Sequence, residues 1–238
     1  MRVGVIVGLL ALGLFLAFQG CFGSSSTSWN QRLTLVIETP QGGVSGSSVT
    51  GRNVVNSTGA MLPPDARGPR GDVTGEAVVI EVMPGNWLFA LIDGSDSVLR
   101  TAKGWPEAAY GLSRAPDGRQ RDFWEQMSVL KSQPLDTPVP LPPEAWPMLV
   151  TFDDITKPET VREVDPEDLA TVFGEGVRLK AVTLEITEEA VTEGRVVALL
   201  PWLGPYPEPA LGPWNGETLA EAPFYLRVHL GDFIRRPE

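Results

Sequence analysis

Cys21 and His229 are the only cysteine and histidine in this chain of 238 residues, so thiol or imidazole chemistry rests on a single residue of each kind. His229 lies two positions after Arg227 in a segment that alternates polar and apolar residues, which predicts a strand with both side chains on its polar face. A Ser-His-Asp triad or a histidine metal site would depend entirely on this ring. We therefore expect His229 to be structural, and we expect neither a metal site nor a cofactor.

Ser45-Gly46-Ser47-Ser48 is the nearest approach to a nucleophile motif. The nucleophile elbow of hydrolases requires Gly-x-Ser-x-Gly between a strand and a helix, and Thr50 stands where the second glycine would be needed after Ser48. The segment is more typical of a hydroxyl-rich strand or bulge. The sequence also lacks the Gly-x-x-x-x-Gly-Lys-Ser/Thr phosphate loop, so nucleotide chemistry has no support.

Carboxylates are the remaining candidates for catalysis or cation binding. Oxygen ligands of this kind bind Ca²⁺, but the ordered Asp-x-Asp-x-Asp-Gly loop is missing, and helix caps with a solvated acidic surface explain the cluster without a metal. Glu185 and Glu188 could form a glycosidase-like pair, which depends on their separation in the fold. The clustered acids follow a predicted strand at residues 148–152 and comprise Asp153, Asp154, Glu159, Glu163, Asp165, Glu167 and Asp168.

Three aromatic residues, Trp202, Tyr206 and Trp214, lie in or near the proline-rich stretch at residues 200–207. If exposed, this rigid apolar loop would be a partner-binding surface, because tryptophan and tyrosine concentrate binding energy. If buried, it would close the open end of a β-sandwich. We expect burial, and we keep these three side chains as the candidate partner-binding residues.

Cys21 stands at the end of an apolar run, Val3 to Phe18, that begins directly after Met1 and Arg2, which is the order of a secretory signal. The stretch Ala17-Phe18-Gln19-Gly20-Cys21 resembles a bacterial lipobox, in which cleavage occurs before an acylated cysteine. Gly20 fits the small residue before the cut, whereas Phe18 and Gln19 depart from the usual leucine and small residue. The resemblance implies a signal peptide at residues 1–20 and a lipid anchor, with chains such as palmitate, on Cys21.

Two alternatives to lipidation remain open at the N-terminus. One is an ordinary cleaved signal, and the other is an uncleaved signal anchor. A spanning helix needs about 20 apolar residues, and this run is shorter, so the anchor is the less favoured of the membrane-attached forms. Every version exports the chain, which places the protein in the cell envelope, facing the periplasm or the cell surface.

Composition limits the partners of the exported chain. Its formal charge is −11, and removal of residues 1–20 takes away one arginine and no acid, which gives −12. An acidic body does not bind nucleic acid or anionic head groups by bulk attraction. A hydrophobic content of 42%, with seven tryptophans and nine phenylalanines, indicates a packed protein rather than a disordered tail.

The pattern along the chain predicts a mainly β fold, with antiparallel sheets arranged like a sandwich and a few short helices. We expect a lipidated Ser-rich linker at residues 21–30 and a single β-rich globular domain at 31–238, with a loop at 56–72. Trp87, Phe89, Leu184 and Ile186 are expected to share one core. The predicted strands are 32–39, 44–55, 76–82, 87–92, 148–152, 177–187 and 224–233. The predicted helices are 105–112, 122–131 and one opened by Asp165 that stops at Gly174.

Several stretches resemble an uncharacterised family of proteobacterial envelope proteins. The likeness covers most of the mature chain and implies a single domain, but it implies no activity and no catalytic residues. It is carried by residues 45–49 (SGSSV), 75–79 (GEAVV), 88–91 (LFAL), 152–155 (FDDI), 164–169 (VDPEDL), 184–187 (LEIT), 191–194 (VTEG) and 200–203 (LPWL).

Two functions follow from these observations. The first is a membrane-anchored envelope lipoprotein that acts as a non-enzymatic binding or structural module, with an envelope protein as its partner. The alternative is a carboxylate-based envelope hydrolase. A concave site that gathers two or more acids with shifted pKa values would favour the enzyme, and the missing nucleophile motif favours the binding module.

We predict that Cys21 carries the lipid and becomes the first residue of the mature protein. Mass spectrometry of the purified protein, compared with a Cys21→Ser variant, tests this prediction. An intact Met1 terminus would contradict it, as would a Cys21→Ser protein that is still cleaved and equally membrane-bound.

Overall fold

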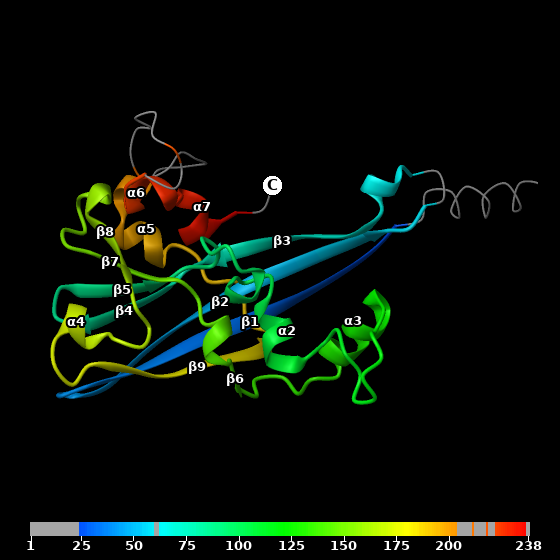
Figure 1. Ribbon diagram of the computed structural model, residues 1–238, viewed down its shortest axis with the longest axis horizontal. Coiled ribbons are helices and arrows are strands. Elements are labelled where there is room, and N and C mark those ends of the chain that lie inside the picture. The colour runs from blue at the N-terminus through cyan, green and yellow to red at the C-terminus, as the bar shows by residue number, and fades with distance from the viewer. Residues whose placement is uncertain (1–23, 60–61, 204–210, 212–217, 219–221, 237–238) are drawn as a thin grey trace, which may run out of the picture. The chain divides into compact units, whose positions relative to one another are not determined.

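The computed structural model describes residues 24–59, 62–203, 211, 218 and 222–236 (Figure 1). The expected signal peptide and Cys21 lie outside this range. The prediction of a mainly β fold with a few short helices is confirmed, because the described residues form a six-stranded and a four-stranded antiparallel sheet. No described helix has the length and apolar character needed to span a membrane.

The chain divides into two compact units, and β1, β2 and β3 contribute residues to both. The described part of the smaller unit consists of residues 24–28, 53–59 and 62–72, in which a single turn, η1 (Pro64–Ala66), accompanies three strand segments. The larger unit contains residues 29–52 and the chain from residue 73 onward. The single domain expected for residues 31–238 stays a prediction.

The six-stranded sheet has the order β10-β3-β2-β1-β9-β6. Its central strand β1 alternates buried Leu33, Leu35 and Ile37 with half-buried neighbours, as period-two patterning requires. Leu33 lies opposite Leu184, and Leu35 lies opposite Val182. The strands are β1 (Ser24–Thr39), β2 (Gly42–Ser57), β3 (Gly68–Glu76), β6 (Val139–Pro140), β9 (Arg178–Thr187) and β10 (Ile234–Arg235).

The four-stranded sheet has the order β4-β5-β7-β8. The hairpin expected at residues 76–92 is confirmed, with Gly85 in the turn at a φ of +79°, a conformation that glycine adopts without strain. Its strands are β4 (Val78–Met83), β5 (Asn86–Ala90), β7 (Leu149–Phe152) and β8 (Val161–Val164).

Two hydrophobic cores cover the opposite faces of β5 in the larger unit. Leu88 and Ala90 belong to a core that also contains the inward side chains of β1 and β9, which gives the expected sandwich-like layers. Phe89 belongs to a second core, closed by the C-terminal helices near β7 and β8 (Figure 1). These helices are α5 (Arg195–Leu199), η5 (Pro201–Leu203), α6 (Phe224–Arg227) and α7 (Leu230–Phe233).

The helices expected at residues 105–112 and 122–131 are present as α2 (Trp105–Tyr110) and α3 (Phe123–Lys131). Asp122 caps α3 by accepting a hydrogen bond from the Glu125 amide. The third expected helix is shorter: α4 (Ala170–Phe173) follows Leu169, while Asp165 accepts a hydrogen bond from the Glu167 amide in a preceding turn. Single turns η2 (Val98–Arg100), η3 (Pro143–Ala145) and η4 (Pro158–Thr160) complete the list.

Three local expectations are wrong. Residues 24–30, expected in a loose linker, belong to β1, and residues 68–72, expected in a loop, belong to β3. Strand pairing satisfies the backbone of these polar segments, so composition alone misleads. Residues 224–233 form α6 and α7 rather than a strand, because only Ile234 and Arg235 pair with β3 and the preceding residues pack on the second core.

The expectation of one core containing Trp87, Phe89, Leu184 and Ile186 is also wrong. Trp87 and Phe89 face the second core, whereas Leu184 belongs to the core between the sheets. Ile186 packs in a third cluster against Met127 and Leu130 of α3. Apolar patterning identifies buried faces, but it does not say which element covers each face.

We predict that Phe89→Ala lowers the free energy of unfolding by about 3–5 kcal/mol, the usual range for a buried phenylalanine. Phe89 is fully buried, and its ring meets those of Phe152 and Phe233 edge-on, at centroid distances of 5.6 and 5.8 Å. Trp87→Ala on the same face is the comparison and is expected to be less damaging, since Trp87 is only half-buried. Urea unfolding measures both, and a loss below about 1 kcal/mol for Phe89→Ala would contradict this packing.

Candidate functional site

Trp202 is half-buried and is held in place by its neighbours. Its Nε1 donates a hydrogen bond of 2.8 Å to the carbonyl oxygen of Ile155, and its ring meets Phe152 edge-on at 5.6 Å. These contacts fix η5 against the end of β7. The other two candidate partner-binding residues, Tyr206 and Trp214, lie outside the described residues.

His229 lies between α6 and α7 rather than on a strand face, which corrects its expected setting. Its backbone amide donates a 2.7 Å hydrogen bond to the carboxylate of Asp232, and its Nδ1 lies 3.7 Å from the same oxygen. Asp232 is 5% exposed, and burial raises the pKa of its carboxyl group although the His229 amide opposes that rise. The contact through the backbone gives His229 a position in the capping of α7.

The serine and glutamate candidates occupy structural positions. Ser48 lies within β2, and its hydroxyl donates a 2.7 Å hydrogen bond to the carbonyl oxygen of Glu76. Glu185 is 5% exposed and forms a 2.5 Å ion pair with Arg32, which also pairs with Glu189. Glu188 is exposed just beyond the end of β9. Arg32 therefore connects Glu185 to Glu189 rather than to the proposed partner Glu188.

Five of the seven clustered acids fall into two groups, while Glu159 lies in η4 and Asp168 accepts hydrogen bonds from Thr171. The first group stabilises the turn after β7: Asp153 pairs with Arg162 at 2.6 Å, and Asp154 pairs with Lys157 at 3.1 Å. Hydrogen bonds from Thr156, together with Lys157, lower the pKa of Asp154 to about 2. Across the described residues, no group of three or more histidine, cysteine or acidic side chains is placed to hold a metal ion.

The second group lines a cavity of about 560 Å³, which we call the acidic cavity. Strand β8 buries Val161 and Val164 and leaves Glu163 exposed, while the following turn supplies two further acids. The remaining lining residues come from η2, η3 and the segment after η3. The lining residues are Arg100, Pro143, Glu144, Trp146, Glu163, Asp165, Pro166 and Glu167.

Hydrogen bonds fix the walls of the acidic cavity. Arg100 Nε donates to the carbonyl oxygen of Trp146 at 2.9 Å, which ties η2 to the segment after η3. The indole Nε1 of Trp146 donates to the carbonyl oxygen of Leu141 at 3.0 Å, and the ring packs against the core between the sheets. These bonds hold the Trp146 side chain in place at the cavity.

Negative charge dominates the acidic cavity. Glu144, Glu163, Asp165 and Glu167 contribute four carboxylates, and Arg100 contributes the only opposing charge among its lining residues. Within the described parts of the chain, none of these four acids forms an ion pair. Carboxylates beside an indole ring are suited to a cationic group, which gains both ion pairing and contact with the aromatic face.

Sequence reasoning identified three of these acids but missed the rest of the cavity. Arg100 and Trp146 are far from the acids in sequence, and neither belongs to a recognisable motif. The only signal was the pairing of a predicted strand at 148–152 with the acidic segment after it. That signal does not specify which distant turn lies opposite.

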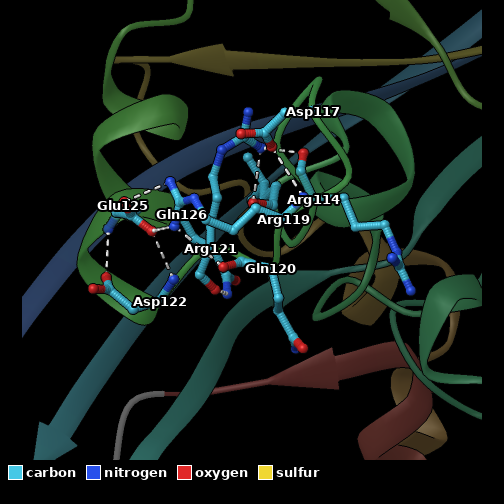
Figure 2. A network of polar contacts seen from close by, with 9 residues as sticks. Arg114, Asp117, Arg119, Gln120, Arg121, Asp122, Glu125 and Gln126 are labelled. Atoms are coloured by element: carbon cyan, nitrogen blue, oxygen red, sulfur yellow. Dashed lines mark hydrogen bonds and ion pairs between the residues drawn. The ribbon is translucent and has the colours of Figure 1, made fainter.

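In a second polar cluster, around the start of α3, the charged side chains bond to one another and to the nearby backbone (Figure 2). Arg119 forms a two-pronged contact with Glu125 at 2.8 and 2.9 Å, which lowers the pKa of Glu125 to about 2. One nitrogen of Arg121, Nη1, donates to three carbonyl oxygens, those of Gly111, Leu112 and Arg114. These contacts stabilise the loop between α2 and α3, so we do not treat the cluster as a ligand site.

No protein-family model, curated protein or solved structure matches the chain.

We predict that Asp232 makes the protein less stable as the pH rises above about 4, near the ordinary aspartate value. Because its folded-state pKa is raised, the unfolded chain releases this proton first, and the free energy of unfolding falls until the folded protein is also deprotonated. Asp232→Asn should remove this pH-dependent contribution to the free energy of unfolding. The asparagine keeps a side-chain oxygen that can accept a hydrogen bond from the His229 amide.

Urea unfolding at several pH values tests the prediction. The stability of Asp232→Asn relative to the unmodified protein should increase as the pH rises. Asp96→Asn, a change of an exposed acid in the loop before η2, should show no such trend. A constant difference between Asp232→Asn and the unmodified protein across the range would contradict the prediction.

Proposed function

We propose that this protein is a lipid-anchored envelope protein that works as a binding module, with the acidic cavity as its site for a cationic group. The ligand class is a primary amine or guanidinium, as carried by a lysine-rich or arginine-rich segment of an envelope protein partner. The observation that carries the proposal is a preformed cavity with four unpaired carboxylates beside a fixed tryptophan.

The sequence at the N-terminus supports the anchored location. The charged start, the apolar run and Gly20-Cys21 have the order of a lipoprotein signal. Multiple acyl chains hold a protein on a membrane far more strongly than a single chain does. Anchoring would confine the protein to two dimensions, where a modest affinity for a neighbouring envelope protein is sufficient for association.

The dimensions and chemistry of the acidic cavity support binding of a cation. Its volume lies in the range of about 300–1,000 Å³ that is typical of ligand sites. Glu163, Glu167 and Trp146 all line the cavity, so a bound cationic group can meet both carboxylates and the indole side chain. Arg100 is committed through Nε to the Trp146 carbonyl oxygen, so it helps to hold the wall that faces the acids.

The hydrolase alternative uses the same acids differently. A carboxylate-based hydrolase needs one protonated carboxyl group, which burial in an apolar setting usually provides. Glu144, Glu163, Asp165 and Glu167 are all exposed, so none of them has such a buried apolar setting. This exposure suits ion pairing with a ligand, and we therefore favour binding over catalysis.

Isothermal titration of the full-length chain with a trilysine peptide tests the proposal. Glu163→Gln and Glu167→Gln should each weaken binding at least fivefold, and added salt should weaken it further, because exposed charges are screened. Glu175→Gln is the matched control: Glu175 is exposed after α4, outside the acidic cavity, and its change should leave the affinity unaltered.

Thermal melting confirms that each variant is folded. Equal binding by all variants would show that the peptide interacts with the acidic surface in general, which would overturn the proposed site. Absence of peptide binding to the folded, unmodified protein would also overturn the proposal.

A further inference from the structure

We propose that a second cavity, which we call the arginine cavity, binds an oxyanion, a carboxylate or phosphate, attached to a short apolar body. It has a volume of about 550 Å³ and lies in the larger unit, where β3, β10 and the segment that leads into α5 meet. Arg235 and Arg236 line it, although the chain as a whole carries a formal charge of −11.

The walls of the arginine cavity are held by backbone contacts. Strand β10 pairs with β3 through Ile234 opposite Glu76 and Arg235 opposite Gly75. The loop before α5 is tied to β2, because the Thr192 amide donates to the Val49 carbonyl oxygen and the Val49 amide donates to the Thr192 hydroxyl, both at 2.9 Å. The site is therefore preformed, which lowers the ordering cost of binding.

The buried carboxylate of Glu76 is bonded to the backbone at the entry to α5. Glu76 is 1% exposed, and its two oxygens accept hydrogen bonds from the amides of Arg195 and Val196 at 2.9 and 3.2 Å. Both of its oxygens are thus bonded to the backbone at the start of α5. Glu193 is the only exposed acid among the residues that line the cavity. The same lining contains the two guanidinium groups of Arg235 and Arg236.

Arg235 is positioned by a glycine rather than by a strong ion pair. Its Cζ lies 3.2 Å from the point where a β-carbon on Gly231 would be, so the guanidinium rests against bare backbone. Its contact with Asp93 is a single one of 3.4 Å, at the long end of the range for a charge-assisted bond. An oxyanion that accepts two guanidinium hydrogen bonds can compete with such a contact.

The apolar part of the ligand is inferred from the other lining residues. Val197 of α5 and Ile234 of β10 are half-buried and face the arginine cavity. Gly194, at the entry to α5, has open space where a side chain would begin, so the ligand can approach its backbone closely. A short aliphatic chain fits these surfaces, while a bare ion would leave them in contact with water.

Titration of the full-length chain with butyl phosphate, butanoate and inorganic phosphate tests the proposal. We expect butyl phosphate and butanoate to bind, and inorganic phosphate to bind at least tenfold more weakly than butyl phosphate. The comparison of butyl phosphate with butanoate identifies the preferred head group. Arg235→Gln and Arg236→Gln should each weaken the binding at least tenfold.

Two further variants separate the role of Arg235 from a general loss of charge or fold. Arg114→Gln removes an exposed arginine from the loop between α2 and α3 and should bind like the unmodified protein. Gly231→Ala keeps every charge but displaces the Arg235 guanidinium, so it should weaken binding with little change in melting temperature. Unchanged binding in folded Arg235→Gln and Gly231→Ala proteins would overturn the proposal, as would no binding of either organic anion to the unmodified protein.

Discussion

A single residue, Ala77, separates the end of β3 in one sheet from the start of β4 in the other. This crossing constrains the larger unit, because the chain must change sheets without exposing its backbone. Ala77 is 2% exposed, and its amide donates a 2.7 Å hydrogen bond to the Phe233 carbonyl oxygen. On one side of it, Gly75 has a φ of +120°, and a β-carbon there would lie 3.0 Å from the Val49 carbonyl oxygen. Only glycine adopts this positive φ without strain and has no β-carbon to crowd the Val49 carbonyl oxygen.

The C-terminal elements are organised around this crossing. Glu76 binds the amides at the start of α5, and β10 pairs with the last residues of β3. The second core then fills the space between the helices and the outer face of β5. The arginine cavity, at β3 and β10 of the six-stranded sheet, is a direct product of this arrangement. The acidic cavity lies instead beside β8 of the four-stranded sheet, where the turn after β8, η2 and η3 supply its other lining residues.

Sequence patterns predicted the elements whose burial is periodic and local. The β4–β5 hairpin, the strand periodicity of β1 and β9, and the capped start of α3 all follow from short-range signals. The patterns failed where a distant partner decides the structure. Residues 224–233 alternate like a strand but form helices on the second core, and polar residues 24–30 form a strand because they are paired. The cavities were predictable only in part, since Glu163 could be singled out but its neighbours Arg100 and Trp146 could not.

The pairing of β1 with β9 has a consequence for how the protein reaches its folded form. Leu33 pairs with Leu184, and Glu76 pairs with Ile234, so neither sheet edge nor core is complete until almost the whole chain is present. Contacts between residues so far apart in sequence carry a large loop-closure cost and are associated with slow folding. During that interval β1 would present an unpaired hydrogen-bonding edge. The order of synthesis thus leaves one edge of the first long strand without its partner until residues 178–187 have been made.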